Sequence, residues 1–205
     1  SAVAQDYAIV GGTVHTLSGQ GKMENATVLI KDGRIQSVTG STDVPAGYQV
    51  IDATGKVVTP GLIGAYTSLG LVEVGLSAGT VDSTSKASPI STSGAALDVS
   101  YAINPDSSII NISRIEGITS AASGMSRTGQ LFNGQGAFIS LGDPASPVMK
   151  RAAYVSTSVE NRGADRNGES RASLWVALEN ALADAAYAKS QDLNAGTEWH
   201  GSISK

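Results

Sequence analysis

The sequence contains no cysteine, so it can form neither a disulfide bond nor a thiolate metal site. Histidine is nearly as scarce, because His15 and His200 are the only two. Charged residues make up 16% and the net charge is −4, which gives no electrostatic basis for binding nucleic acid or an anionic membrane. No apolar run approaches the ~20 residues that span a bilayer. What remains is a chain of 205 residues, long enough for one or two domains with a hydrophobic core.

Short β-strands separated by tight turns are predicted for the first sixty residues. The clearest signal is Asp32-Gly33, between the apolar runs 26–30 and 35–38, because glycine supplies the positive φ that a tight hairpin turn requires. No helical period occurs in this region. We therefore predict that residues 1–60 form a small antiparallel β-sandwich or meander.

After Pro60-Gly61 the sequence changes character. The continuous apolar run 62–66 is typical of a strand buried on both faces. Further strands are predicted at 118–122 and at 134–141, the latter after a turn at Asn133-Gly134. A short helix is expected from Ser108 to Glu116. The segment 75–100 is rich in serine, glycine and threonine and is predicted to be a long loop.

A longer helix is predicted to follow a polar loop at 156–170. It begins at Arg171 and runs to about Lys189, because apolar residues recur there with helical spacing. They are Leu174, Leu178, Ala181, Leu182 and Ala185. This apolar face is expected to pack against a barrel, or to bind a partner if nothing in this chain covers it.

Two sets of segments resemble a known family. The stretches 28–35 and 51–63 resemble the opening of amidohydrolase-superfamily proteins, and 101–106, 114–119 and 133–137 resemble the imidazolonepropionase-like branch. The resemblance implies a small β-sandwich of the composite type followed by the first βα units of a metal-dependent-hydrolase-type (β/α)8 barrel. It also implies hydrolase activity that uses a divalent metal such as zinc.

The chain departs from that family at the metal site. In the family, Pro-Gly-Leu-Ile is followed by Asp-x-His-x-His, whose histidines share one face of the first barrel strand and hold the ion. Here Gly64 takes the aspartate position, and Tyr66 and Ser68 take the two histidine positions. A serine hydroxyl is a poor ligand, and a phenol must first lose a proton with a pKa of about 10. We therefore predict no cofactor bound by this chain itself.

Length gives a second departure. A complete (β/α)8 barrel takes about 250 residues, whereas roughly 145 follow the predicted sandwich, enough for about two or three βα units. We expect residues 61–205 to form a partial barrel whose open strand edges need covering. The expected partner is the C-terminal remainder of the barrel or a second chain that completes it, either another copy of this chain or an active paralogue.

Five residues are candidates for lining a ligand pocket: Tyr66, Ser68, Glu73, Asn133 and Gln135. Carboxyl ends of barrel strands are where such folds bind ligands. For Tyr66 and Ser68 the simpler interpretation is that they fill the space of a lost metal. Glu73 is more simply a solvated loop charge, and the two amides more simply belong to a tight turn.

Three functions fit these features. The first is a degenerate, non-catalytic binding or scaffolding protein, or the N-terminal fragment of one. The second is a metal-dependent hydrolase of carbon–nitrogen bonds in cyclic amides, with its catalytic residues outside this chain. The third is a structural β-sandwich module. Ala2-x-Ala4 resembles the end of a secretory cleavage site, so a periplasmic or otherwise exported location is expected, with the cytoplasm as the alternative.

Overall fold

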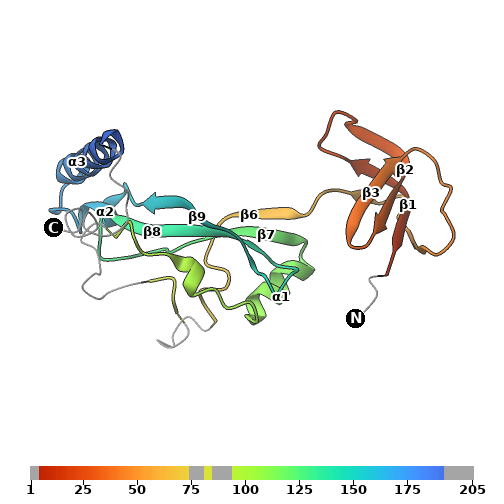
Figure 1. Cartoon of the computed structure of the whole chain (residues 1–205), viewed down its shortest axis with the longest axis horizontal. Coiled ribbons are helices and arrows are strands. Elements are labelled where there is room, and N and C mark those ends of the chain that lie inside the picture. Colours follow the sequence, from red (N-terminus) through yellow and green to blue (C-terminus); the bar gives the residue numbers. More distant parts are fainter. Residues whose placement is uncertain (1–4, 74–80, 85–93, 192–205) are drawn as a thin grey trace. The chain divides into compact units, whose positions relative to one another are not determined.

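The computed structural model describes residues 5–73, 81–84 and 94–191, and the chain divides into two compact units, Ser1–Gly61 and Leu62–Lys205 (Figure 1). Most of the predicted loop 75–100 lies outside the described residues, as do Ala2, Ala4 and His200. None of the described helices is long and apolar enough to cross a membrane.

The first unit is one mixed sheet of five strands in the order β3-β2-β1-β4, with β5 also paired to β1. Its small core contains Val14, Ala26 and Val28. Asp32 and Gly33 both have positive φ and join β2 to β3, which confirms the predicted hairpin. The strands are β1 (Tyr7–His15), β2 (Lys22–Lys31), β3 (Arg34–Thr39), β4 (Gln49–Asp52) and β5 (Val57–Val58).

Strands β1, β2 and β3 form the antiparallel meander that was one of the two predicted arrangements. The other, a sandwich, is not what residues 5–61 form. Strands β4 and β5 both run parallel to β1 and extend the same sheet. Among the described residues of this unit, no second layer faces that sheet. Strand β1 continues through Gly11 (φ 79°) and Gly12, where its pairing with β2 is irregular.

The second unit contains a sheet of four strands in the order β6-β7-β8-β9. Strands β6 and β7 are parallel, whereas the pairs β7–β8 and β8–β9 are antiparallel. The elements are β6 (Leu62–Thr67), the 3-10 turn η2 (Val99–Tyr101), α1 (Ser108–Ile115), β7 (Ile118–Ser123), β8 (Phe132–Ser140), β9 (Val148–Thr157), α2 (Asn161–Ala164) and α3 (Arg171–Ser190).

Among the described elements, β6-α1-β7 is a βαβ unit and β9 is followed by helices α2 and α3, so two strand–helix pairs stand against the two or three βα units expected. The connections 124–131 and 141–147 are too short for the crossover of a dozen or more residues that a parallel neighbour needs. Each next strand therefore turns back beside the previous one. The predicted turn at Asn133-Gly134 is also wrong, because both residues lie inside β8. Strand β9 was not predicted.

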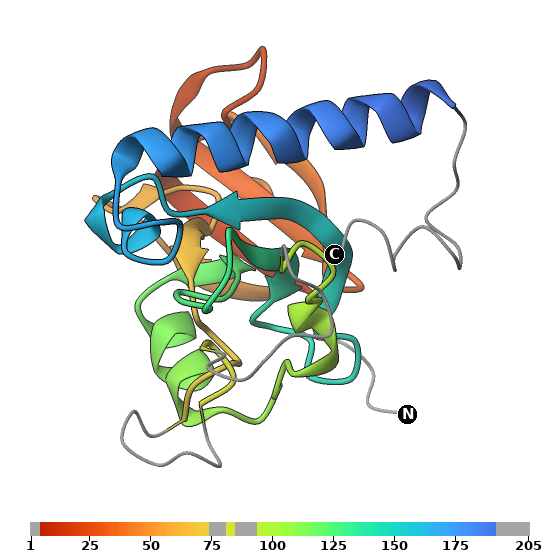
Figure 2. The same ribbon diagram turned by 90° about the vertical axis from the view of Figure 1, so that its left-hand side faces the viewer.

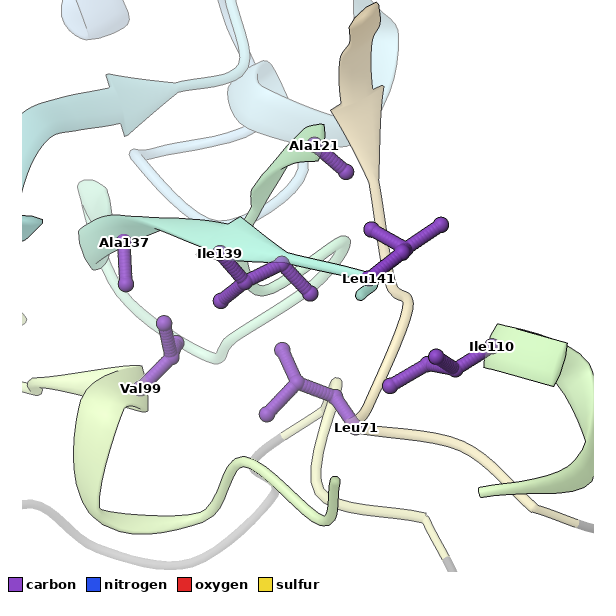
Figure 3. Close-up of a cluster of buried hydrophobic side chains, with 7 residues drawn as sticks. All are labelled: Leu71, Val99, Ile110, Ala121, Ala137, Ile139 and Leu141. Carbon is purple, nitrogen blue, oxygen red and sulfur yellow. The ribbon is translucent and has the colours of Figure 1, made fainter. Parts of the chain in front are cut away.

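One face of this sheet carries the main core (Figure 3). The cluster is Leu71, Val99, Ile110, Ala121, Ala137, Ile139 and Leu141. Helix α1 and η2 lie on that side of the sheet, and α3 lies on the other side (Figures 1 and 2). The small side chains of Ala121 on β7 and Ala137 on β8 let the residues that cover this face, among them Val99 of η2, pack close to the strands. This face is therefore closed by the unit's own residues.

Strand β6 exists as predicted but is not buried. Leu62 is 60% exposed and Ile63 64%, because β6 is an edge strand. Both long-helix boundaries are confirmed to within a residue or so, since α3 spans Arg171–Ser190. Its predicted apolar face is confirmed in part: Leu174 is buried, whereas Leu182 is 57% exposed.

Candidate functional site

The candidate site lies where β6, β7 and β9 have their carboxyl ends. These three strands run in one direction and β8 runs in the other. Tyr66 is the next-to-last residue of β6 and Ser156 the next-to-last of β9. The sheet order places β7 and β8 between these two strands, yet their side chains meet.

Tyr66 connects three parts of the sheet. Its hydroxyl donates to the carbonyl oxygen of Met125, just after β7, at 2.8 Å. It also lies 3.4 Å from the Ser156 hydroxyl oxygen on β9. Because one side chain reaches across two intervening strands, the sheet must curve strongly at this end. Tyr66 remains 54% exposed.

Tyr154 packs beside Tyr66 and completes what we call the tyrosine cluster: Tyr66, Tyr154, Ser156 and the Met125 carbonyl. The two ring centroids are 6.3 Å apart at an interplanar angle of 54°, a common aromatic arrangement. The Tyr154 hydroxyl is buried and has no hydrogen-bond partner among the described residues. Burial, and to a smaller extent the neighbouring Tyr66, raise the pKa of Tyr154 above its usual 10.0.

Two glycines make room for the Tyr154 ring. A Cβ atom on Gly136 would overlap the ring itself, and one on Gly124 would lie 2.6 Å from its hydroxyl oxygen. Side chains alternate along a strand, so Gly136 faces away from Ala137 and Ile139 of the main core. The tyrosine cluster therefore occupies the face of the sheet opposite that core.

Ser68 does not join this cluster. Its backbone carbonyl accepts from the Leu71 amide at 2.9 Å, and its hydroxyl makes no hydrogen bond within the described part of the chain. Thr67, between the two candidate positions, donates its hydroxyl to the Ala122 carbonyl at 3.1 Å. The strand end is thus held by Thr67 and Tyr66.

Glu73 lies at another place, the N-terminus of α1. Its Oε1 accepts from the Ser108 amide at 3.1 Å and from the Ser108 hydroxyl at 2.5 Å. These bonds, with the nearby Ser107 hydroxyl, lower the pKa of Glu73 below its usual 4.5. Glu73 is therefore a helix-capping carboxylate rather than a freely solvated one.

The two amides are not in a simple turn. Asn133 is only 3% exposed, and its Nδ2 donates to the Ser158 hydroxyl at 3.4 Å. The backbone N–H of Gln135 donates to the Leu97 carbonyl at 2.6 Å. Gly134, with φ of 94°, leaves space for Leu97. Gly134 and Gln135 thus hold the segment around Leu97 against β8. The five candidate residues do not converge on one pocket.

Tyr154 and Ser156 are the site residues that sequence reasoning missed. The run 148–157 alternates too weakly between apolar and polar residues to be recognised as a strand. The usable signal was Gly136 beside Gly134, since small residues in a strand often mark the close approach of another group.

Comparisons with known proteins bear on this arrangement. No family model matches the chain. A dihydroorotase of Listeria monocytogenes serovar 1/2a is 38% identical over 63 residues, which cover 31% of this chain and 14% of that protein. An imidazolonepropionase of Klebsiella pneumoniae is 45% identical over 49 residues, covering 24% of this chain and 12% of that protein.

A solved structure adds the fold. An amidohydrolase from Thermotoga maritima superimposes with a TM-score of 0.74 over 97% of this chain and 54% of its own, at 18% identity. The chain is therefore similar to amidohydrolase-superfamily proteins in sequence over part of its length and in fold over nearly all of it. It thus spans about half of that amidohydrolase structure and a smaller share of the two curated relatives.

The amidohydrolase metal does not fit the residues present. At the first-strand positions the Tyr66 hydroxyl already donates a hydrogen bond to the Met125 carbonyl, so it is engaged with the chain itself. Ser68 offers only a hydroxyl, a poor ligand for a transition metal. Within residues 5–73, 81–84 and 94–191, no three His, Cys, Asp or Glu side chains group closely enough to hold an ion.

Proposed function

We propose that this chain is part of a degenerate amidohydrolase-like protein that binds or scaffolds and does not catalyse hydrolysis through a first-strand metal. The observation that carries the proposal is the tyrosine cluster. Tyr66 stands at the first metal-ligand position, and its hydroxyl is engaged with Met125 and Ser156. Tyr154 fills the adjoining space over two glycines. A direct contact between side chains thus replaces a shared ion.

The same proposal includes a partner that completes an incomplete (β/α)8 barrel. Strand β6 has one neighbour, β7, and exposes Leu62 and Ile63. On helix α3, Trp175 and Val176 are each about half exposed. A helix that is apolar on several sides is normally covered on several sides. The counterpart of the unmatched half of the Thermotoga fold, in this polypeptide or in a second copy or active paralogue, would cover both surfaces.

The alternative is a working metal-dependent hydrolase of carbon–nitrogen bonds whose ligands lie in another part of the protein. The identity to an imidazolonepropionase over 49 residues favours this alternative. A metal held by other residues would activate water and polarise a carbonyl. We also propose an exported location, supported by Ala2-x-Ala4 alone.

Zinc binding separates these functions. The native-sequence chain and the double variant Tyr66→Phe/Ser68→Ala are dialysed against zinc and then against buffer, and retained zinc is measured. We expect both to retain the same substoichiometric amount, because neither position is a ligand. Loss of bound zinc in the double variant would contradict the proposal. Stoichiometric zinc retained equally by both proteins, with hydrolytic activity, would establish the alternative.

A further inference from the structure

A small cavity lies beside the N-terminus of α1, separate from the tyrosine cluster. Its volume is about 160 Å³, and its polar lining residues are Glu73, Asp82, Asn104 and Ser107. The remaining lining comes from residues 70–72 just after β6. No residue of the tyrosine cluster lines it, so what it binds does not depend on the function proposed above.

We propose that this cavity binds a calcium ion through oxygen atoms of Glu73, Asp82 and Ser107. The polar side chains that line it carry carboxylate, hydroxyl and amide groups. Such donors suit hard cations, and calcium in particular accepts flexible sets of carboxylate, hydroxyl and carbonyl oxygens.

Glu73 presents one carboxylate oxygen that lacks a partner. Its Oε1 is engaged by the Ser108 amide and hydroxyl. Its Oε2 is shielded from solvent and accepts no hydrogen bond within the described part of the chain. A carboxylate oxygen removed from water without a compensating partner is unfavourable. A cation in the cavity supplies that partner.

Ser107 supplies a second buried oxygen beside the Glu73 carboxylate. The residue is only 1% exposed, yet its hydroxyl has no hydrogen-bond partner among the described residues. Its hydroxyl lies close enough to the Glu73 carboxylate to help lower the pKa of that group, and both residues line the cavity. A buried, unpaired hydroxyl in the cavity wall is available as an oxygen ligand for an ion.

The charge of the lining also favours a cation. Glu73 and Asp82 bring two carboxylates to one cavity, and none of the described lining residues is basic. The Asp82 side chain makes no hydrogen bond within the described part of the chain. Asn104 already uses its Oδ1 to accept from the Asp106 amide at 3.0 Å, so it is a weaker candidate ligand than the two carboxylates.

Calorimetric titration of the full chain with calcium chloride tests the site. We expect one saturable ion per chain, with a Kd on the order of 10⁻⁴ to 10⁻³ M, typical of weak calcium sites. Asp82→Asn and Glu73→Gln should each weaken binding at least about tenfold, because each removes one of two ligand charges. The matched control is Asp106→Asn, which removes the same charge two residues before α1 without touching the cavity.

Several outcomes would overturn the proposal. They are the absence of saturable heat for the native-sequence chain, unchanged affinity in Asp82→Asn, or an equal loss in Asp106→Asn. Magnesium chloride binding as tightly as calcium chloride would contradict the assignment to calcium. Glu73→Gln also weakens the cap of α1 by removing its charge, whereas Asp82→Asn breaks no hydrogen bond of the described chain. The Asp82 variant therefore decides the test if the Glu73 variant unfolds.

Discussion

The two faces of the second unit's sheet are completed in different ways. On one face, a cluster that includes Leu71, Ile110 and Ile139 is closed by the chain's own loop and helix. On the other, Tyr66 and Tyr154 pack against each other at the carboxyl end of the strands. The first face shows what this sequence stabilises alone. The second is where we propose that side-chain contacts stand in place of a metal site.

The largest expected effect is the difference in stability between a substitution in the buried core and one on the exposed edge strand β6. Ile139 is fully buried in the core, whereas Ile63 on β6 is 64% exposed. Ile139→Ala should lower the free energy of unfolding by about 2–5 kcal/mol, and Ile63→Ala by only about 0.5 kcal/mol. Urea unfolding followed by tryptophan fluorescence reports this unit, since both tryptophans, Trp175 and Trp199, belong to it. Equal losses would show that β6 is covered in solution.

Next in size is the glycine beneath the Tyr154 ring. Gly136→Ala should destabilise the unit by about 1–3 kcal/mol, because its methyl group would overlap that ring. Gly129→Ala is the control, since a Cβ there meets no atom within 4 Å. Adding Tyr154→Ala to Gly136→Ala should recover part of the loss, because the clash is removed. If Gly136→Ala and Gly129→Ala behave alike, Tyr154 does not lie over Gly136.

A smaller effect is expected from the Tyr66 hydroxyl. Tyr66→Phe removes its hydrogen bond to Met125, which should cost about 0.5–1.5 kcal/mol. Tyr187→Phe is the matched control, because Tyr187 is 61% exposed and its hydroxyl makes no hydrogen bond within the described chain. Thermal unfolding of the two variants measures the difference. If the Tyr66→Phe protein is as stable as the Tyr187→Phe control, the Tyr66 hydroxyl does not stabilise the cluster.

The smallest effect concerns alkaline pH. The folded-state pKa of Tyr154 is raised above 10.0, so the neutral form is favoured in the folded protein. Its contribution to stability is complete below pH 10 and is lost as the pH rises through the folded-state pKa, since the unfolded chain releases its proton first. Tyr154→Phe should therefore flatten the fall of stability above pH 10. An unchanged slope would contradict the burial of this phenol.

Local patterns predicted those parts of the fold that local physics determines. Asp32-Gly33 indicated the hairpin because only certain residues adopt positive φ, and the spacing from Leu174 onward indicated α3. The sequence did not reveal that β8 and β9 turn back, because strand direction depends on tertiary pairing. At the site, Tyr66 was found from its position in a family motif. Its partner Tyr154 was not, since that contact joins residues far apart in the sequence.

We propose that Tyr66 and Ser68 stand at the two positions of the family's metal-binding histidines and bind no metal. Elemental analysis of the native protein at its full encoded length, with intact mass on the same sample, tests it most directly. We predict no stoichiometric zinc, iron or nickel per chain, whatever the mass. About one transition metal or more per chain, lost on Tyr66→Phe/Ser68→Ala substitution, would contradict the claim.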